Sequence, residues 1–158
     1  MLLIREPGGA WSAPRAGLLF DEDVLKMVLV QAPALLRVSP HADLVLVRDF
    51  EIPVTGCVDL LGIDTSGDIT IAHCSRRGEG ETRRDFSGSL LAFAAALWKL
   101  PYGEFDRLFA QRMATPLAAA LARVAVSGQV DWSEERFRLA VSRNLEAGNF
   151  RLLVVVSR

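Results

Sequence analysis

The chain has few of the features that mark whole classes of protein. Its two cysteines, Cys57 and Cys74, are too few for a disulfide framework in 158 residues and suit a reducing cytoplasm. A formal net charge of −1 gives no overall attraction for nucleic acid. No apolar run is long enough to cross a bilayer, and the first residues lack the basic and apolar regions of a signal peptide. We therefore expect a cytoplasmic protein with no membrane partner.

What the chain does have is enough apolar sequence for a folded core, since 51% of its residues are apolar. Residues 1–18 are rich in Gly, Pro and Ala and predict a loose N-terminal arm. We expect residues 19–158 to form a single domain, either as a whole protein or as a piece cut from a longer chain.

Periodicity predicts the elements of this domain. Helical spacing and capping signals predict helices at 21–36, 83–100, 101–113, 115–126 and 132–148, the first ending or kinking near Pro33. Short β-branched and aliphatic runs predict three mostly antiparallel strands, at 43–50, 54–64 and 68–75. The apolar run at 150–156 predicts a strand buried on both faces. The expected fold class is α/β (α+β), with a mixed sheet of about four to five strands flanked by helices.

Five segments of the chain carry a resemblance to a known family. They are "DEDVLKMVLVQAPALL", "VDLLGID", "TSGDITIAHCS", "SGSLLAFAAALWKLPYGEFDRLF" and "NLEAGNFRLLVVV". Together they resemble the PD-(D/E)-x-K, or restriction-endonuclease-like, nuclease superfamily, and look closest to its small bacterial nuclease-like proteins of undetermined role. The resemblance runs from about Leu19 to Val156 and implies a restriction-endonuclease-like sheet.

The resemblance also implies an active site, and most of its positions have changed. Asp59 matches the metal-binding aspartate, and Glu22 matches a glutamate of the first helix. His73 stands where a second metal-binding carboxylate belongs, and Ser75 stands where a lysine belongs.

On the following helix, Ser89 replaces the usual glutamine and Phe93 the usual tyrosine. The activity implied by the resemblance is Mg²⁺-dependent phosphodiester hydrolysis. An imidazole in place of a carboxylate suits Mg²⁺ poorly, and loss of the lysine removes a cation that stabilises the reacting charge. We expect no cofactor and no ordinary cleavage, whereas an active site would take Mg²⁺ or Mn²⁺.

Two other arrangements of the same segments remain open. Cys57, Asp59 and His73 could form a three-ligand site for a softer transition metal, although no tight ligand spacing supports it. The alternative is that Cys57 and Cys74 are small buried residues and His73 is hydrogen-bonded at a strand end. The register decides which side chain meets Asp59: a two-residue loop at 66–67 brings Cys74 opposite it, whereas a longer loop or a bulge at Gly67 brings His73 or Ser75.

A basic loop follows the third predicted strand. Arg76, Arg77, Arg83 and Arg84 could bind the phosphates of DNA, although nearby acids dilute their charge and the loop could equally be solvated.

These patterns predict a catalytically degenerate nuclease-like domain that acts as a nucleic-acid-associated or protein-interaction module. One alternative is an active metal-dependent nuclease with a site rebuilt from Glu22, Asp59 and His73. The third is a structural or dimerisation domain with no nucleic-acid contact.

Overall fold

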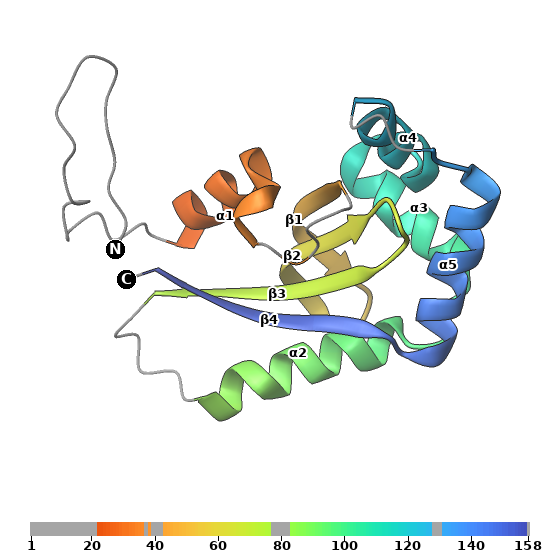
Figure 1. Ribbon diagram of the computed structural model, residues 1–158. Coiled ribbons are helices and arrows are strands. Elements are labelled where there is room, and N and C mark those ends of the chain that lie inside the picture. The colour runs from red at the N-terminus through yellow and green to blue at the C-terminus, as the bar shows by residue number, and fades with distance from the viewer. Residues whose placement is uncertain (1–21, 37, 39–42, 77–82, 128–130, 158) are drawn as a thin grey trace, which may run out of the picture.

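The protein was analysed as a computed structural model that describes residues 22–36, 38, 43–76, 83–127 and 131–157. The predicted N-terminal arm lies outside these residues. The fold is α+β, with one mixed sheet and helices against both of its faces (Figure 1). Among the described helices, none is long and apolar enough to cross a membrane.

The element order is a helix, three strands, four helices and a final strand. The strands are β1 (Leu44–Ile52), β2 (Gly56–Asp64), β3 (Ile69–Arg76) and β4 (Phe150–Ser157). The helices are α1 (Glu22–Gln31), the short 3-10 helix η1 (Pro33–Leu36), α2 (Arg83–Leu97), α3 (Tyr102–Met113), α4 (Leu117–Ser127) and α5 (Glu134–Ala147). As predicted, the first helix ends just before Pro33, whose ring cannot continue it.

The four strands lie side by side in the order in which they occur along the chain. β1 pairs antiparallel with β2 and β2 antiparallel with β3, whereas β4 returns after the helices to pair parallel with β3. This confirms the predicted mixed sheet. β1 and β4 are its two edge strands.

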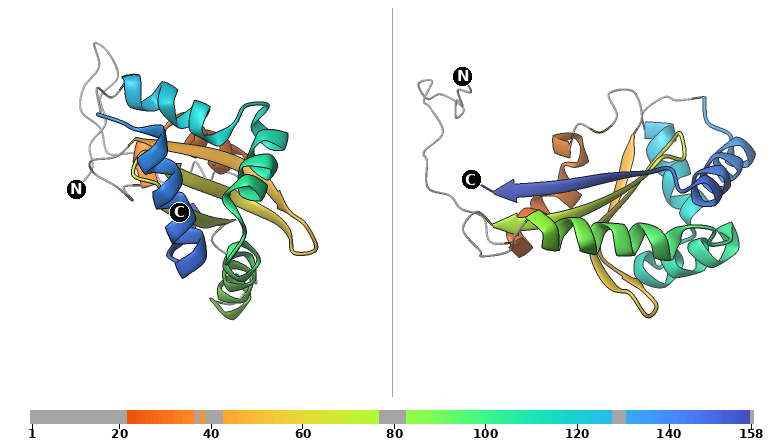
Figure 2. Two further views of the ribbon diagram at one scale, coloured as in Figure 1. Left: turned by 90° about the vertical axis from the view of Figure 1, so that its right-hand side faces the viewer. Right: turned by 90° about the horizontal axis from the view of Figure 1, so that it is seen from below.

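Each face of the sheet is covered by different helices (Figures 1 and 2). On one face, Leu25 and Leu29 of α1 pack against Leu60 and Cys74 of the sheet. On the other face, α2 to α5 cover a larger core that contains Phe50, Leu61, Ile71, Leu97, Phe105, Phe109, Leu121, Phe137 and Val141. Among the described residues, the sheet is covered by α1 and the following η1 on the side where the candidate site lies.

The turn between β2 and β3 sets the register of the site. The pairs Leu60↔Ala72 and Ile63↔Ile69 leave residues 65–67 as a three-residue loop, one residue longer than the strict alternative. Gly67 closes this loop with φ +87°, a conformation that favours glycine. A Cβ there would lie 2.8 Å from Ala140 Cβ, so the loop also needs glycine for its packing. Continued along the strands, this register brings Asp59 opposite His73.

The prediction that residues 150–156 are buried on both faces is wrong. β4 lies at the edge of the sheet, where Leu152, Val154 and Val156 are 38%, 46% and 45% exposed. Leu153 and Val155 point to the opposite face. They pack there against the buried apolar residues between α1 and the sheet, which we call the α1 cluster: Leu25, Leu29, Leu46, Leu60, Ala72 and Cys74. A continuous apolar run predicts that both faces of a strand are buried only when neighbouring elements cover both faces. Helix α2 covers the face that carries Leu152, Val154 and Val156 only in part.

Candidate functional site

Helix α1 places a charged pair on its buried side. Glu22 and Lys26 are one turn apart and share a face with Leu25 and Leu29, which pack on the sheet. Lys26 is only 6% exposed, whereas lysine is rarely buried without a charged partner. Its ammonium group therefore has to find its partners inside the fold.

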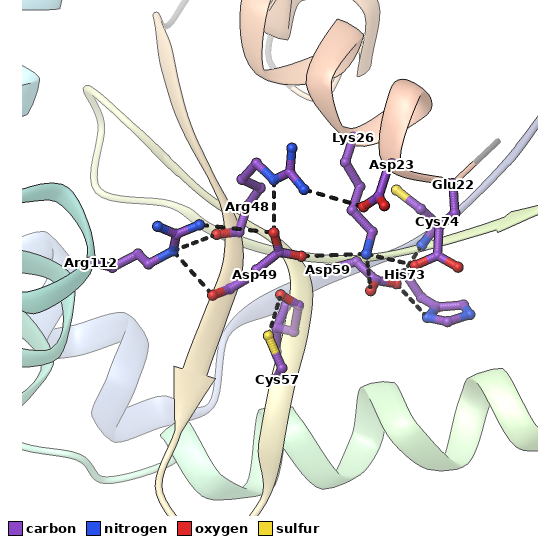
Figure 3. Close-up of polar contacts among 11 residues, drawn as sticks. Glu22, Asp23, Lys26, Arg48, Asp49, Cys57, Asp59, His73, Cys74 and Arg112 are labelled. Atoms are coloured by element: carbon purple, nitrogen blue, oxygen red, sulfur yellow. Dashed lines mark hydrogen bonds and ion pairs between the residues drawn. The ribbon is translucent and has the colours of Figure 1, made fainter. Parts of the chain in front are cut away.

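Three carboxylates surround the Lys26 ammonium (Figure 3). Lys26 Nζ lies 2.6 Å from Glu22 Oε1, 3.1 Å from Asp59 Oδ1 and 3.4 Å from Asp49 Oδ1. The three acids come from α1, β2 and β1. We call these four residues the Lys26 cluster. The ammonium offsets the repulsion between carboxylates that would otherwise face one another with little water between them.

Asp49 joins the cluster because the sheet is kinked there. The pairs Arg48↔Leu60 and Phe50↔Val58 place Asp49 opposite Asp59, and Asp49 has a left-handed φ of 50°. Regular strands would keep Val58 and Leu60 on one face, yet Leu60 packs with the α1 cluster and Val58 with the other core. Aspartate tolerates positive φ better than most residues, although such a conformation still costs on the order of 1 kcal/mol.

Two arginines brace the kink (Figure 3). Arg48 Nε lies 2.7 Å from Asp49 Oδ2, and its Nη2 lies 3.2 Å from Asp23 Oδ1. From α3, Arg112 Nε donates hydrogen bonds to the main-chain carbonyls of Arg48 and Asp49, at 3.0 and 3.2 Å. Arg112 thereby covers part of the outer edge of β1. The guanidinium groups of Arg48 and Arg112 both contact carboxylates of the same chain.

Asp59 uses its second oxygen on β3. Oδ2 lies 2.7 Å from His73 Nδ1 and accepts a hydrogen bond of 2.8 Å from the main-chain N–H of Cys74. The two oxygens of Asp59 thus have different partners: Oδ1 the ammonium, and Oδ2 the imidazole and the amide. Asp59 is the residue that joins α1, β2 and β3 at this point.

The electrostatics of the cluster keep Lys26 charged. Burial alone would lower the pKa of Lys26, but its hydrogen bonds and charge interactions with Glu22 and Asp59 outweigh burial and raise that pKa above the usual lysine range. Burial likewise works against the charged form of Asp49. The hydrogen bond from Arg48 and the charge of Lys26 outweigh it and lower the pKa of Asp49. These interactions therefore favour the charged forms of Lys26 and Asp49.

Glu22, Asp59 and His73, three of the predicted site residues, lie in or beside the Lys26 cluster. Ser75 is buried two residues further along β3, at 5% exposure. On α2, Ser89 is exposed and Phe93 is half-buried against the larger core. Of the six motif positions, Glu22, Asp59 and His73 thus lie together at the Lys26 cluster, whereas Ser89 and Phe93 lie on α2.

Most of the predicted basic loop lies outside the residues that the structure describes. Arg77 lies outside the described residues. Arg76 ends β3, and Arg83 and Arg84 begin α2, but the description does not extend to their side chains. Their proposed contacts with phosphate stay a prediction.

The structure gives no support to the predicted metal set of Cys57, Asp59 and His73. Cys57 is exposed, and its sulfur lies 3.8 Å from the Val58 carbonyl oxygen. Within residues 22–36, 38, 43–76, 83–127 and 131–157, no three His, Cys, Asp or Glu side chains are grouped to hold a metal ion. The alternative that Cys57 is buried is wrong, whereas Cys74 is fully buried, as that alternative predicted.

The two thiols are expected to react very differently with an alkylating reagent. Burial, followed by the charge of Asp59, raises the pKa of Cys74 to about 12. Partial burial and the nearby acids Asp49 and Glu51 also raise the pKa of Cys57, but its thiol is exposed. Mass spectrometry of the folded protein at pH 8 should show one adduct, lost in Cys57→Ser and kept in Cys74→Ser. Two adducts on the folded protein would show that the packing between α1 and the sheet opens readily.

Sequence reasoning missed Lys26 and Asp49. A signal for Lys26 was present, because a lysine on the same helix face as Leu25 and Leu29 needs a buried partner. Asp49 had no comparable signal, since its place depends on a backbone kink that no local pattern marks.

Comparisons of the chain with protein-family models, with curated proteins and with solved structures found no match. The geometry of the site therefore carries the functional argument.

Proposed function

We propose that the protein is a non-catalytic, nuclease-like domain that works by contact with other proteins, with Lys26 as a fixed cation where a nuclease would hold a metal ion. The observation that carries the proposal is the Lys26 cluster: one ammonium with three carboxylates at 2.6 to 3.4 Å.

The geometry suits an ammonium better than a magnesium ion. Mg²⁺ binds oxygen at about 2.1 Å and prefers six ligands in an octahedron. The three acids instead lie at ordinary ion-pair distances from Lys26 Nζ. Asp59, the residue that matches the metal-binding aspartate, has both oxygens engaged. A metal ion would have to displace Lys26, whose side chain is 8% exposed.

The charges around the cluster favour a protein partner over nucleic acid. Among the described residues near the kink, Lys26, Arg48 and Arg112 are the cations, and all three contact acids or carbonyls of the chain itself. A phosphate approaching here would meet Asp23, Asp49 and Glu22 without a spare cation. Nucleic acid would therefore be expected to bind at the predicted basic residues Arg76, Arg77, Arg83 and Arg84 rather than at the Lys26 cluster.

A second candidate function rests on the same lysine. If the resemblance holds, Lys26 supplies from α1 the cation that is missing at Ser75, and Glu22, Asp59 and His73 are the ligands of an active metal-dependent nuclease. This function requires that Mn²⁺ or Mg²⁺ can enter the cluster of the native protein while Lys26 remains there.

DNA titrations separate these functions. Labelled single-stranded, duplex and branched DNA are mixed with the protein at low and moderate salt in EDTA, Mg²⁺ or Mn²⁺, and anisotropy and strand integrity are followed. We expect intact strands and no salt-sensitive binding. The controls are Asp59→Asn and a variant with Arg76, Arg77, Arg83 and Arg84 changed to glutamine.

Either of two results would overturn the proposal. Cleavage that Asp59→Asn abolishes would establish the nuclease. Salt-sensitive binding without cleavage, lost in the four-arginine variant, would make the domain a nucleic-acid-binding module.

A further inference from the structure

The two edge strands of the sheet, β1 and β4, differ in how far other described elements cover them. At β1, helix α3 packs alongside and Arg112 bonds the carbonyls of Arg48 and Asp49. At β4, no described strand pairs with the outer edge. Figures 1 and 2 show β4 at the margin of the sheet, with α2 along one side of it. One edge is thus blunted and the other remains available for pairing.

The available edge is apolar. The side chains of Leu152, Val154 and Val156 lie on one face of β4 and are 38% to 46% exposed. We call these three residues the β4 stripe. Edge strands of monomeric proteins are usually protected by charges, proline or a covering element. The only charged residue within β4, Arg151, is already paired with Asp64 and Asp68 and does not protect the edge.

The β4 stripe is complementary to itself. If two copies pair antiparallel about a twofold axis at Val154, Leu152 of each copy faces Val156 of the other, and the two Val154 side chains meet. Arg151 then lies opposite position 157, a serine, so no charge faces its own copy. A twofold axis closes the assembly after two copies, because each copy's β4 edge is then paired with that of the other.

We infer that the protein forms a homodimer by antiparallel pairing of β4 with β4 of a second copy, which makes one continuous eight-stranded sheet. The occupant is a second copy because the stripe offers an apolar surface and main-chain donors and acceptors, but no unpaired charge that would select a charged partner. The inference rests on the proposed function in one respect: it identifies a second copy of this chain as the protein that the domain contacts. The two can fail separately, because DNA cleavage and oligomeric state are measured independently.

The first test is the mass of the full chain in solution. Sedimentation should give twice the 17.3 kDa chain mass for the native protein. Val154→Lys should weaken dimerisation by about a hundredfold, because two ammonium groups would face each other at the axis. The matched control is Val126→Lys on α4, at a position that is 79% exposed, and this variant should remain dimeric.

The second test is a disulfide cross-link, which reports pairing of β4 directly and does not rely on a substitution that disrupts the dimer. In a Cys57→Ser background, Val154→Cys should form a disulfide-linked dimer with glutathione disulfide as the oxidant. Residues opposite one another in antiparallel strands have Cα atoms about 4.5–5.5 Å apart, within the range that a disulfide spans. Val126→Cys is the control and should give little covalent dimer. A monomeric native protein, or a dimer that neither links at position 154 nor responds to Val154→Lys, would overturn the inference.

Discussion

Replacing Lys26 with methionine is expected to lower the free energy of unfolding by about 3 kcal/mol near neutral pH. Methionine keeps much of the length and apolar volume of the stem but removes the ammonium. Asp59, 16% exposed, and Asp49, 34% exposed, would then face each other and Glu22 without their shared cation. The partial exposure of Asp49 and Glu22 lets water screen part of the repulsion, so the estimate stays at the low end for a broken buried ion pair.

The destabilisation should depend on pH in a defined direction. In the native protein the pKa of Asp49 is lowered, partly by Lys26, so Asp49 contributes stability above its ordinary pKa that is lost as the pH falls. Lys26→Met removes part of that contribution, and at low pH the acids are protonated in both proteins. The difference in unfolding free energy between native protein and variant should therefore shrink as the pH falls from about 5 to about 2, through the ordinary and then the lowered pKa of Asp49.

Urea unfolding at several pH values measures this effect. The matched control is Lys99→Met, which makes the same chemical change at an exposed lysine that lies over the Trp98 ring. It should cost well under 1 kcal/mol. If Lys26→Met costs no more than Lys99→Met, or costs as much at about pH 2 as at about pH 7, the ammonium does not hold the carboxylates together.

Asp64→Ala is expected to cost a similar amount, about 3 kcal/mol. The Asp64 side chain is 1% exposed, and its Oδ1 accepts hydrogen bonds from the N–H groups of Ser66 and Asp68, at 2.9 and 3.0 Å. Its Oδ2 lies 3.1 Å from Arg151 on β4. Alanine leaves two partly buried N–H groups without this acceptor and removes one of the two carboxylates paired with Arg151.

Asp64→Asn separates the two roles of this side chain. The amide oxygen can still accept from Ser66 and Asp68, but the charge that pairs with Arg151 is gone. We expect a loss of about 1 kcal/mol for asparagine in urea unfolding, well below that of alanine. Equal losses for the two variants would show that the ion pair, rather than the turn, accounts for the stabilisation.

Much of the fold could be predicted because its signals are local. Pro33 marks the end of α1, and Ser133 caps α5 by accepting from the Arg136 N–H. Gly148 ends α5 in the left-handed conformation that glycine favours. These signals depend on backbone chemistry within a few residues, so they give the same answer in the isolated sequence and in the folded chain.

The edge position of β4 and the kink at Asp49 could not be predicted in the same way. An apolar strand has the same pattern whether or not a neighbour covers its second face, as Leu152 and Val154 show. The kink depends on the positive φ of Asp49 and on Arg112, which is distant in sequence. Both features arise from packing between segments rather than from local sequence.

The candidate site lies between these cases. The resemblance placed Glu22, Asp59 and His73 together, and the structure brings them around one point. It could not place Lys26, because on α1 the resemblance marks only Glu22. A comparison along the sequence does not show which charged side chains from different elements meet in the folded chain.

Calorimetric titration with Mn²⁺ tests the central claim most directly. If Lys26 is the cation of this site, the native protein should bind no Mn²⁺ at the cluster. Lys26→Met should gain binding at micromolar to millimolar Mn²⁺, which Asp59→Asn in the same background removes. The same ion should also restore part of the stability lost in Lys26→Met. Binding of Mn²⁺ to the native protein, abolished by Asp59→Asn, would contradict the account and establish a site that holds a metal ion alongside Lys26.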